Sequence, residues 1–304
     1  MKIFLSGATG VIGTRVIPLL VKKGHSVTAA TRSTRKAGIV ERLGAEPREV
    51  DLFDPAKVAS VVKGHDVVIN LATSVPPSSR ALMPGAWRET GRVRRYVSAN
   101  LAKAARETDA QRLIQESFAP IYADAGDEWI TETSTIKPAR YNRTVVDAER
   151  AAATFATGGG VGIVLRFGFF YGPDSDFTRD AINMVRKGWA PALGSPGGFI
   201  SSVSHDDAAT AVAAAVDAAG GTYNVVDDDP LTKRDFYDSL ADALGVAPPK
   251  FLPPWVRYLT GSVGATLGRS QRISNSRLRS AGWAPKVRSA KAGWPLLLRQ
   301  LPSG

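Results

Sequence analysis

The chain has 304 residues, a net charge of +11, 44% hydrophobic residues and no cysteine. This length allows one large domain or two with a full core, and the lack of cysteine excludes disulfides, thiolate metal sites and thiol catalysis. The three histidines lie far apart in the sequence, which argues against a metal centre. No apolar run is long enough for a membrane span or a signal-peptide core, so we expect a cytoplasmic protein without a membrane partner.

The first thirteen residues predict a dinucleotide-binding turn. Residues 3–6 have the pattern of an apolar strand, Gly7, Gly10 and Gly13 follow in a turn, and residues 14–23 have helical apolar spacing. Gly7 permits a sharp turn, Gly10 lets a pyrophosphate approach bare backbone N–H groups, and Gly13 lets the helix pack closely on the strand. A purely structural turn is the alternative, and a second strand pattern at residues 25–31 favours the nucleotide.

Strand and helix patterns alternate through the first two-thirds of the chain, which predicts an α/β fold with a Rossmann-type doubly wound parallel sheet. We expect further strands at residues 47–52, 66–72, 112–117 and 162–170, and helices at residues 88–108 and 142–156. The later patterns are shorter, with a helix at residues 206–218, a strand at 222–226, a helix at 232–244 and a proline-rich connector at 248–254.

These patterns predict the domain organisation. Residues 1–172 are expected to form the nucleotide-binding domain, and residues 199–228 are expected to return to it. We expect residues 173–304 to form mainly a smaller C-terminal substrate-binding subdomain, docked where ligands of open α/β folds bind.

The positive charge is concentrated near the C-terminus. Residues 243–304 contain ten Lys and Arg residues and no Asp or Glu. An anionic partner such as nucleic acid or a membrane surface is one interpretation of this segment. No recognition-helix or RNA-binding motif accompanies the charge, so a solvated basic face is favoured and no nucleic-acid partner is expected.

Several segments together resemble the extended short-chain dehydrogenase/reductase superfamily, which includes nucleotide-sugar epimerases and dehydratases. They are residues 7–13 (GATGVIG), 51–52 (DL), 70–72 (NLA), 166–173 (RFGFFYGP), 203–206 (VSHD), 223–225 (YNV) and 282–285 (GWAP). The resemblance implies a nucleotide held by Gly7, Thr9, Gly10, Val11, Ile12 and Gly13 at the pyrophosphate, Asp51 and Leu52 beside the adenine, Leu71, Ala72 and Thr73 along the cofactor, and Phe167 and Gly168 near the nicotinamide.

The end of the second strand predicts which dinucleotide binds. NAD-binding folds usually place a carboxylate there, which accepts hydrogen bonds from both ribose hydroxyls. This chain has Thr31 at that place, followed by Arg32 and Arg35. A guanidinium can bind a 2′-phosphate that a carboxylate would repel. We therefore expect NADP(H) rather than NAD, with a solvated basic loop as the alternative.

The resemblance also implies a catalytic Ser or Thr, a Tyr, and a Lys four residues after the Tyr, and here the chain departs from the pattern. Phe118 occupies the hydroxyl position with Ser117 directly before it, Tyr141 occupies the tyrosine position, and Val145 occupies the lysine position. Without that cation, a phenol near its usual pKa of about 10 is a poor proton relay at neutral pH. Tyr141 and Ser117 are the catalytic candidates, with a packing tyrosine and a buried strand-end serine as alternatives.

Three functions are compatible with these residues. The first is NADPH-dependent reduction of a ketone, with hydride from the nicotinamide and protonation by a non-standard route. The second is nucleotide-sugar epimerase or dehydratase chemistry, which is disfavoured because its first step needs a competent base. The third is a non-catalytic NADPH-sensing binding protein.

Aromatic residues predict the class of substrate. Those in the segments expected to border the pocket include Trp87, Trp129, Phe169, Trp255 and Tyr258. They favour a large aromatic or hydrophobic ligand, for example a polyketide or another secondary metabolite in antibiotic biosynthesis, although they could equally form the core of the smaller subdomain. We expect a small-molecule substrate and a monomer or homodimer.

Overall fold

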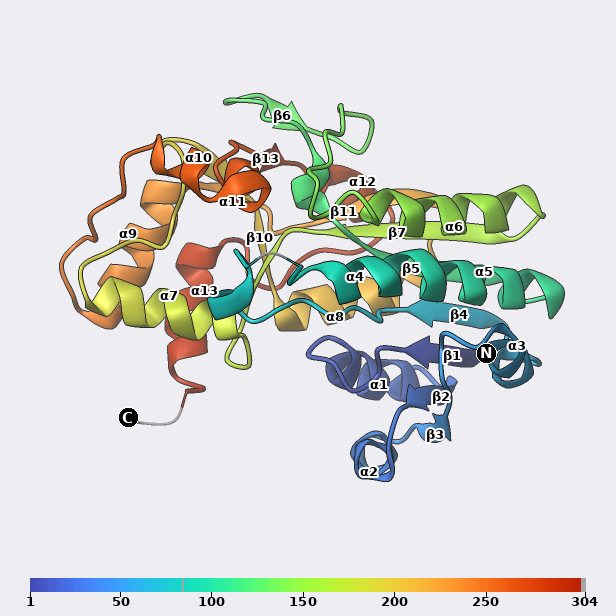
Figure 1. The fold of residues 1–304 in the computed structure, drawn as a ribbon. Coiled ribbons are helices and arrows are strands. Elements are labelled where there is room, and N and C mark those ends of the chain that lie inside the picture. Colours follow the sequence, from blue (N-terminus) through green and yellow to red (C-terminus); the bar gives the residue numbers. More distant parts are fainter. Residues whose placement is uncertain (84, 302–304) are drawn as a thin grey trace.

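The computed structural model describes residues 1–83 and 85–301, and its centre is a seven-stranded parallel sheet (Figure 1). The strand order is β11-β7-β5-β4-β1-β2-β3. The strands are β1 (Lys2–Ser6), β2 (Ser26–Thr31), β3 (Glu46–Glu49), β4 (Val67–Asn70), β5 (Arg112–Phe118), β7 (Val161–Phe167) and β11 (Gly221–Val225). The chain winds outward from β1 in both directions, which confirms the predicted doubly wound Rossmann-type fold.

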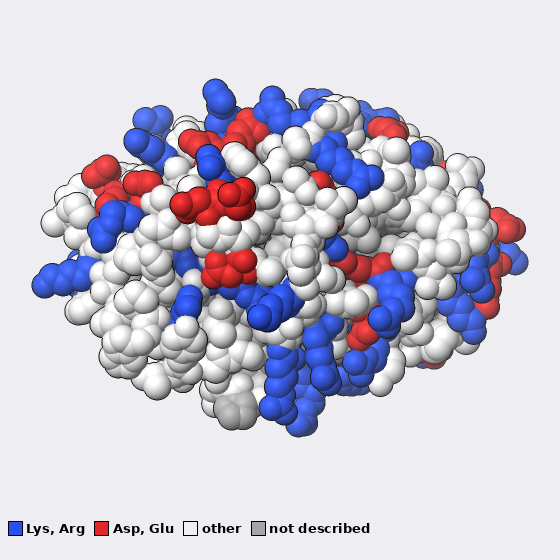
Figure 2. Space-filling model, turned by 90° about the horizontal axis from the view of Figure 1, so that it is seen from above, with Lys and Arg blue, Asp and Glu red and all other residues white. Residues whose placement is uncertain are grey.

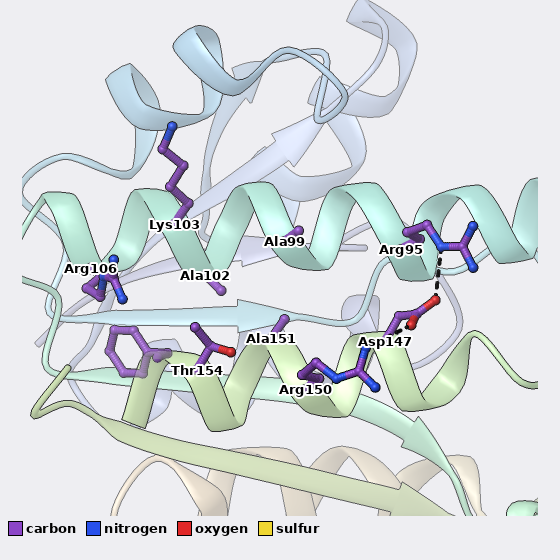
Figure 3. A pocket seen from close by; sticks show the side chains of 10 residues that line it. Arg95, Ala99, Ala102, Lys103, Arg106, Asp147, Arg150, Ala151 and Thr154 are labelled. Atoms are coloured by element: carbon purple, nitrogen blue, oxygen red, sulfur yellow. Dashed lines mark hydrogen bonds and ion pairs between the residues drawn. The ribbon is translucent and has the colours of Figure 1, made fainter. Parts of the chain in front are cut away.

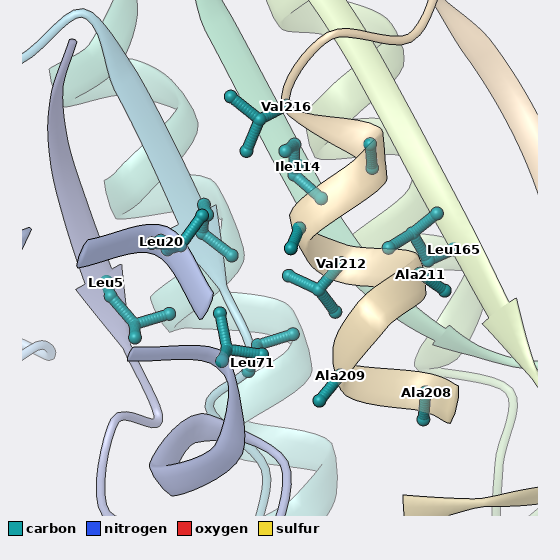
Figure 4. Packing of buried hydrophobic residues seen from close by; sticks show 14 of the residues in the cluster. Leu5, Leu20, Leu71, Ile114, Leu165, Ala208, Ala209, Ala211, Val212 and Val216 are labelled. Atoms are coloured by element: carbon teal, nitrogen blue, oxygen red, sulfur yellow. The ribbon is translucent and has the colours of Figure 1, made fainter. Parts of the chain in front are cut away.

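Helices cover both faces of this sheet (Figure 1). One face carries α1 (Gly13–Lys22), α2 (Thr34–Arg42) and α8 (His205–Ala215), and the other carries α3 (Pro55–Val62), α5 (Ser98–Glu107) and α6 (Val145–Thr157). Helix α8 contributes Ala208, Ala209, Ala211 and Val212 to the core, near Leu5 and Ile114 of the strands (Figure 4). Because alanine side chains are short, this helix can lie close to the sheet.

The helix predicted over residues 88–108 is one continuous helical run with an irregular centre. It begins as α4 (Arg88–Arg92), passes through a π-helical turn at Val93–Val97 and continues as α5. Asn70, the last residue of β4, donates a hydrogen bond to Ser98 at the start of α5. The π turn therefore lies at the carboxyl end of the sheet, where ligands of open α/β folds bind.

The strand predicted over residues 162–170 is interrupted. Strand β7 ends directly before Gly168, and a separate strand, β8 (Phe169–Tyr171), pairs with β10 (Ser202–Ser204) outside the central sheet. A Cβ on Gly168 would lie 2.6 Å from the carbonyl oxygen of Ser201. A glycine is needed at this break because the two backbones approach each other too closely for a side chain.

The chain after β8 builds a separate apolar cluster, apart from the packing on the two faces of the sheet, beyond the carboxyl ends of β1 and β4 (Figure 1). Helices α7 (Asp176–Arg186), α9 (Lys233–Leu244) and α13 (Ala290–Leu298) pack there around Trp294 and Phe236. The short elements are the pairs β9 (Phe199–Ile200) with β12 (Leu231–Thr232) and β6 (Trp129–Ile130) with β13 (Arg272–Ile273), and the helices α10 (Val256–Leu259), α11 (Gly261–Leu267) and α12 (Ser276–Ser280). Among the helices of residues 1–83 and 85–301, none is both long and apolar enough to cross a membrane.

Candidate functional site

The glycine turn after β1 has the geometry of a phosphate cradle. Gly7 has a φ of +75°, and a Cβ there would collide with the backbone of Leu71. A Cβ on Gly13 would collide with the backbone of Gly7 and Ala8, because α1 begins directly against the turn. Gly10 is exposed, and a Cβ on it would meet only the carbonyl oxygen of Gly7, at 3.2 Å. The turn therefore leaves bare backbone open to a ligand at the N-terminus of α1.

The other residues predicted to bind the nucleotide follow neighbouring strands of the sheet. Arg32 and Arg35 are exposed after β2, at the start of α2, and Thr31 before them is buried. Leu71 to Thr73 follow β4, next to the glycine turn. Since parallel strands end at one edge of a sheet, these residues and the glycine turn share one edge. Their contacts with a nucleotide stay a prediction.

Asp51 and Leu52 lie in a turn, because β3 ends two residues before them and is shorter than the predicted strand over residues 47–52. The Asp51 carboxylate accepts a hydrogen bond from the backbone N–H of Phe53 at 3.0 Å and is otherwise exposed. The turn after β3 still belongs to the same sheet edge. The carboxylate thus orders its own loop whether or not an adenine lies beside it.

Phe167 and Gly168 have packing roles of their own at the end of β7. Phe167 is only 1% exposed, and its ring lies 5.3 Å from the ring of Phe170. Gly168 faces Ser201, as described above. The Phe167 side chain is thus not free to contact a nicotinamide, and the approach of both residues to that ring stays a prediction.

Ser117 is part of a buried ionic network. It is fully buried, and its hydroxyl donates a hydrogen bond to Glu149 Oε1 at 2.5 Å. The same carboxylate accepts two hydrogen bonds from Arg166, from Nε at 2.8 Å and from Nη2 at 2.7 Å. Such a bidentate pair is charge-assisted and geometrically specific. The predicted catalytic hydroxyl therefore already has a partner inside the fold.

The network continues to the neighbouring strand. Arg166 Nη1 donates to the phenol oxygen of Tyr122 at 2.8 Å, and that phenol donates to Asn224 Oδ1 on β11. The sequence analysis assigned no role to Arg166 or Asn224, although Arg166 interrupts an otherwise apolar strand pattern and so signals a buried partner. The network therefore connects β7 with α6 and with β11 through hydrogen bonds.

Tyr141 lies in the segment that leads into α6. Its ring packs edge-on against Trp87, with centroids 4.7 Å apart. Burial raises the pKa of the Tyr141 phenol to about 12, and the positive charges of Arg94 and Arg269 partly oppose this rise. The phenol is therefore protonated at neutral pH.

The position of the superfamily lysine is apolar. Val145 is fully buried at the first turn of α6. Arg140 and Arg143, which are near it in the sequence, are both exposed. The cation that acts on Tyr141 consequently comes from other elements, from Arg94 in the π turn and from Arg269 after α11.

Some arginines of the basic C-terminal region contact other parts of the same chain. Lys and Arg side chains are spread over the face drawn in Figure 2, with a denser group along its lower edge. The guanidinium of Arg272 lies 4.2 Å from the ring centroid of Trp129 and 4.9 Å from that of Phe199. Arg279 forms an ion pair with Asp228 at 2.5 Å. These arginines therefore fasten the C-terminal segment to the rest of the molecule.

A groove of 420 Å³ lies between α5 and α6 and is separate from the candidate site (Figure 3). Arg95 and Asp147 form an ion pair at one end of it. Its lining residues are Arg95, Ala99, Ala102, Lys103, Arg106, Asp147, Arg150, Ala151, Thr154 and Phe155. None of the residues predicted to bind cofactor or substrate lines this groove.

Comparisons with known proteins identify the family of the chain. A family model described as NAD(P)H-binding matches residues 7–219, which include the glycine turn. A reductase of Streptomyces sp., "3-diazoavenalumate denitrifying reductase", is 31% identical to the chain over 96% of this chain and 99% of its own. A ketoreductase of Stigmatella aurantiaca that acts on a farnesylated quinoline oxide is 26% identical over 81% of this chain and 74% of its own.

Solved structures share the fold at lower identity. A human epimerase family protein solved with NADPH superposes with a TM-score of 0.82 at 20% identity, over 99% of this chain and 100% of that one. UDP-glucose 4-epimerase of Thermus thermophilus, solved with NAD, gives a TM-score of 0.79 at 24% identity, over 98% of both chains. The family model and the Streptomyces relative together show the family. The chain belongs to the NAD(P)H-binding family and is an oxidoreductase of the extended short-chain dehydrogenase/reductase type.

Proposed function

We propose that the protein is an NADPH-dependent reductase of a ketone on a large aromatic or hydrophobic substrate. The names of the Streptomyces and Stigmatella relatives, a reductase and a ketoreductase, support the reaction class. The glycine turn with its open backbone at Gly10 supports the binding of a dinucleotide. Bound NADPH would supply the hydride, and the protein would orient the ketone and provide the proton.

The burial of the Tyr141 phenol, which raises its pKa, is the observation that supports the direction of the reaction. With a pKa of about 12, the phenol is ionised in roughly one molecule in 10⁵ at pH 7. Reduction of a ketone needs a proton donor for an alkoxide, which is a far stronger base than a phenolate. Oxidation of an alcohol, with which epimerase and dehydratase chemistry begins, needs a base instead. The neutral phenol therefore favours reduction.

Of the two catalytic candidates, we propose Tyr141 as the proton donor. The Ser117 hydroxyl already donates a hydrogen bond to Glu149, and Glu149 accepts hydrogen bonds from Arg166. A hydroxyl held in this way would have to break a charge-assisted hydrogen bond before it could meet a substrate oxygen. We assign Ser117 to the stability of the network.

NADPH rather than NADH is favoured by the charge after β2. Thr31 is buried at the place where NAD-binding folds carry a carboxylate, and the exposed Arg32 and Arg35 follow it. Among the described residues, neither guanidinium group forms an ion pair, so both are available to a 2′-phosphate.

Aromatic side chains support the substrate class. Phe118, Phe169 and Phe177 are partly buried and form a row, with centroids 6.1 Å and 6.4 Å apart. Trp255, directly before α10, and Tyr258, within it, are 60% and 67% exposed. Such residues suit a flat apolar ligand, such as a polyketide or another secondary metabolite in antibiotic biosynthesis.

We propose that residues 173–304 mainly bind this substrate. We also propose that the protein is cytoplasmic and is a monomer or a homodimer.

A test follows the loss of reduced-nicotinamide absorbance when the purified protein is mixed with NADPH and a panel of aromatic and aliphatic ketones. We expect turnover of an aromatic ketone with NADPH, a much weaker reaction with NADH, and a loss of turnover in Tyr141→Phe with unchanged NADPH binding. Tight NADPH binding without turnover of any ketone would refute the reductase and favour the NADPH-sensing alternative. Epimerisation of a nucleotide sugar would favour the epimerase alternative.

A further inference from the structure

Arg94 is a buried cation with free hydrogen-bond donors. It lies in the π turn and is only 3% exposed. Nη2 lies 3.4 Å from Glu116 Oε1, which is a long ion pair. Among the described residues, Nε and Nη1 of Arg94 have no hydrogen-bond partner, and neither has Glu116 Oε2. Buried guanidinium donors are normally satisfied, so these unpaired groups point to a ligand.

The surroundings of Arg94 identify where such a ligand would lie. The guanidinium carbon is 6.0 Å from the ring centroid of Phe118, the residue at the hydroxyl position of the superfamily. The positive charge of Arg94 also acts on the phenol of Tyr141. Phe118, at the hydroxyl position of the superfamily, cannot donate a hydrogen bond, and Arg94 lies close to it. Val145, at the lysine position, carries no charge, and Arg94 supplies a positive charge near the Tyr141 phenol.

We infer that Arg94 binds the substrate oxygen and replaces both missing groups, as hydrogen-bond donor and as cation. This inference rests on the proposed reductase function and names its catalytic residue. A developing alkoxide would receive N–H donors from the free edge of the guanidinium, in a site from which water is largely excluded. Arginine suits the task because it stays charged when buried, where a lysine can lose its proton.

The reaction balances with these groups. Bound NADPH would supply the hydride that forms the new C–H bond at the carbonyl carbon, and the π electrons of the C=O bond would move to the oxygen. The resulting alkoxide is stabilised by Arg94 and takes the proton of Tyr141. The alcohol and the oxidised cofactor would then leave, and solvent would return a proton to the tyrosinate.

The site can be tested by binding as well as by turnover. Removal of Arg94 alone would strand the carboxylate of Glu116, so the test variant is Arg94→Met combined with Glu116→Gln. Its matched control is Arg95→Met, which removes the neighbouring arginine, half-exposed and paired with Asp147 on the outer surface. Circular dichroism and the NADPH dissociation constant of each variant establish that the fold and the nucleotide site remain intact.

Two measurements on these full-length proteins decide the inference. Turnover of a ketone should fall by about 10²- to 10³-fold in kcat in the double variant, with little change in NADPH affinity, and Arg94→Lys should recover part of it. Calorimetry with the NADP⁺-loaded protein should show that benzoate, which offers an anionic oxygen, binds at least about tenfold more tightly than benzyl alcohol. The double variant should lose this preference, and Arg95→Met should keep it.

The outcomes separate the inference from the proposed function. A kcat within about threefold of the parent in the double variant, or an unchanged preference for benzoate, would overturn the role of Arg94 and leave the reductase intact. If the parent reduces no ketone, the proposed function fails, and the benzoate measurement still decides whether Arg94 forms an oxyanion site. Equal binding of benzoate and benzyl alcohol by the parent would overturn that site.

Discussion

Replacement of Ser117 by alanine separates a structural hydroxyl from a catalytic one. The hydroxyl donates to Glu149 at 2.5 Å in a fully buried setting, and the carboxylate keeps its two hydrogen bonds from Arg166 when the serine is lost. A hydrogen bond to a charged group contributes about 1.5–3 kcal/mol. We expect Ser117→Ala to lower the free energy of unfolding by about 2 kcal/mol and to leave kcat nearly unchanged.

The assay is urea denaturation combined with steady-state kinetics. The slope m should not change, because the variant exposes the same surface on unfolding. Glu149→Ala should cost more, about 3–5 kcal/mol, because it leaves Arg166 buried without a counter-charge. Ser60→Ala is the control, because Ser60 is exposed and its hydroxyl, among the described residues, donates only to the carbonyl oxygen of Lys57. This variant should change the stability by less than about 0.5 kcal/mol.

One result would refute this reasoning. If Ser117→Ala lowered kcat by more than about 10²-fold and left the urea midpoint in place, the hydroxyl would act on the substrate oxygen, as the sequence pattern suggested.

Three further predictions concern the cradle, the 2′-phosphate and a buried histidine. Gly13→Ala should abolish NADPH binding and lower the melting temperature, whereas Gly10→Ala should mainly weaken binding, as calorimetry and thermal denaturation would show. Arg32→Ser should weaken NADPH binding about tenfold and leave NADH binding nearly unchanged; an equal loss of both would contradict the charge argument. Burial lowers the pKa of His205 from 6.5 to about 4, so the stability that its neutral form provides is complete above pH 6.5 and is lost as the pH falls towards 4. This amounts to about 3 kcal/mol, and His205→Gln should remove that part of the pH dependence of urea unfolding.

The nucleotide-binding half of the molecule could be predicted from the sequence because its signals are local. The glycine turn, the alternating strands and the helix after Asn142 each depend on a few consecutive residues. The early end of the strand before Asp51 and the break at Gly168 could not be predicted, because both depend on which distant backbone lies alongside. Strand length is decided by pairing partners, and no partner is visible in a single segment.

The candidate catalytic residues were harder to predict, again because their contacts join segments that are distant in the sequence. The resemblance to the superfamily pointed to Tyr141 and to the loss of the lysine at Val145. Arg94 gave no signal, since an arginine in the helical sequence Val-Arg-Arg-Tyr looks like a surface residue until the neighbouring Arg95 is seen to be exposed and Arg94 buried. The partnership of Ser117 with Glu149 spans 32 positions and needs the folded sheet to exist.

The π turn at Val93–Val97 has a consequence for how relatives should be aligned. An added or deleted residue in a helix rotates every later side chain by about 100° relative to the earlier ones. A regular α-helix across the same span would hold one residue fewer than the π turn, so the residues of the turn would take other directions relative to Phe118 and Tyr141. Whether a homologue shares this guanidinium is therefore decided by a gap in the alignment as much as by the letter at position 94.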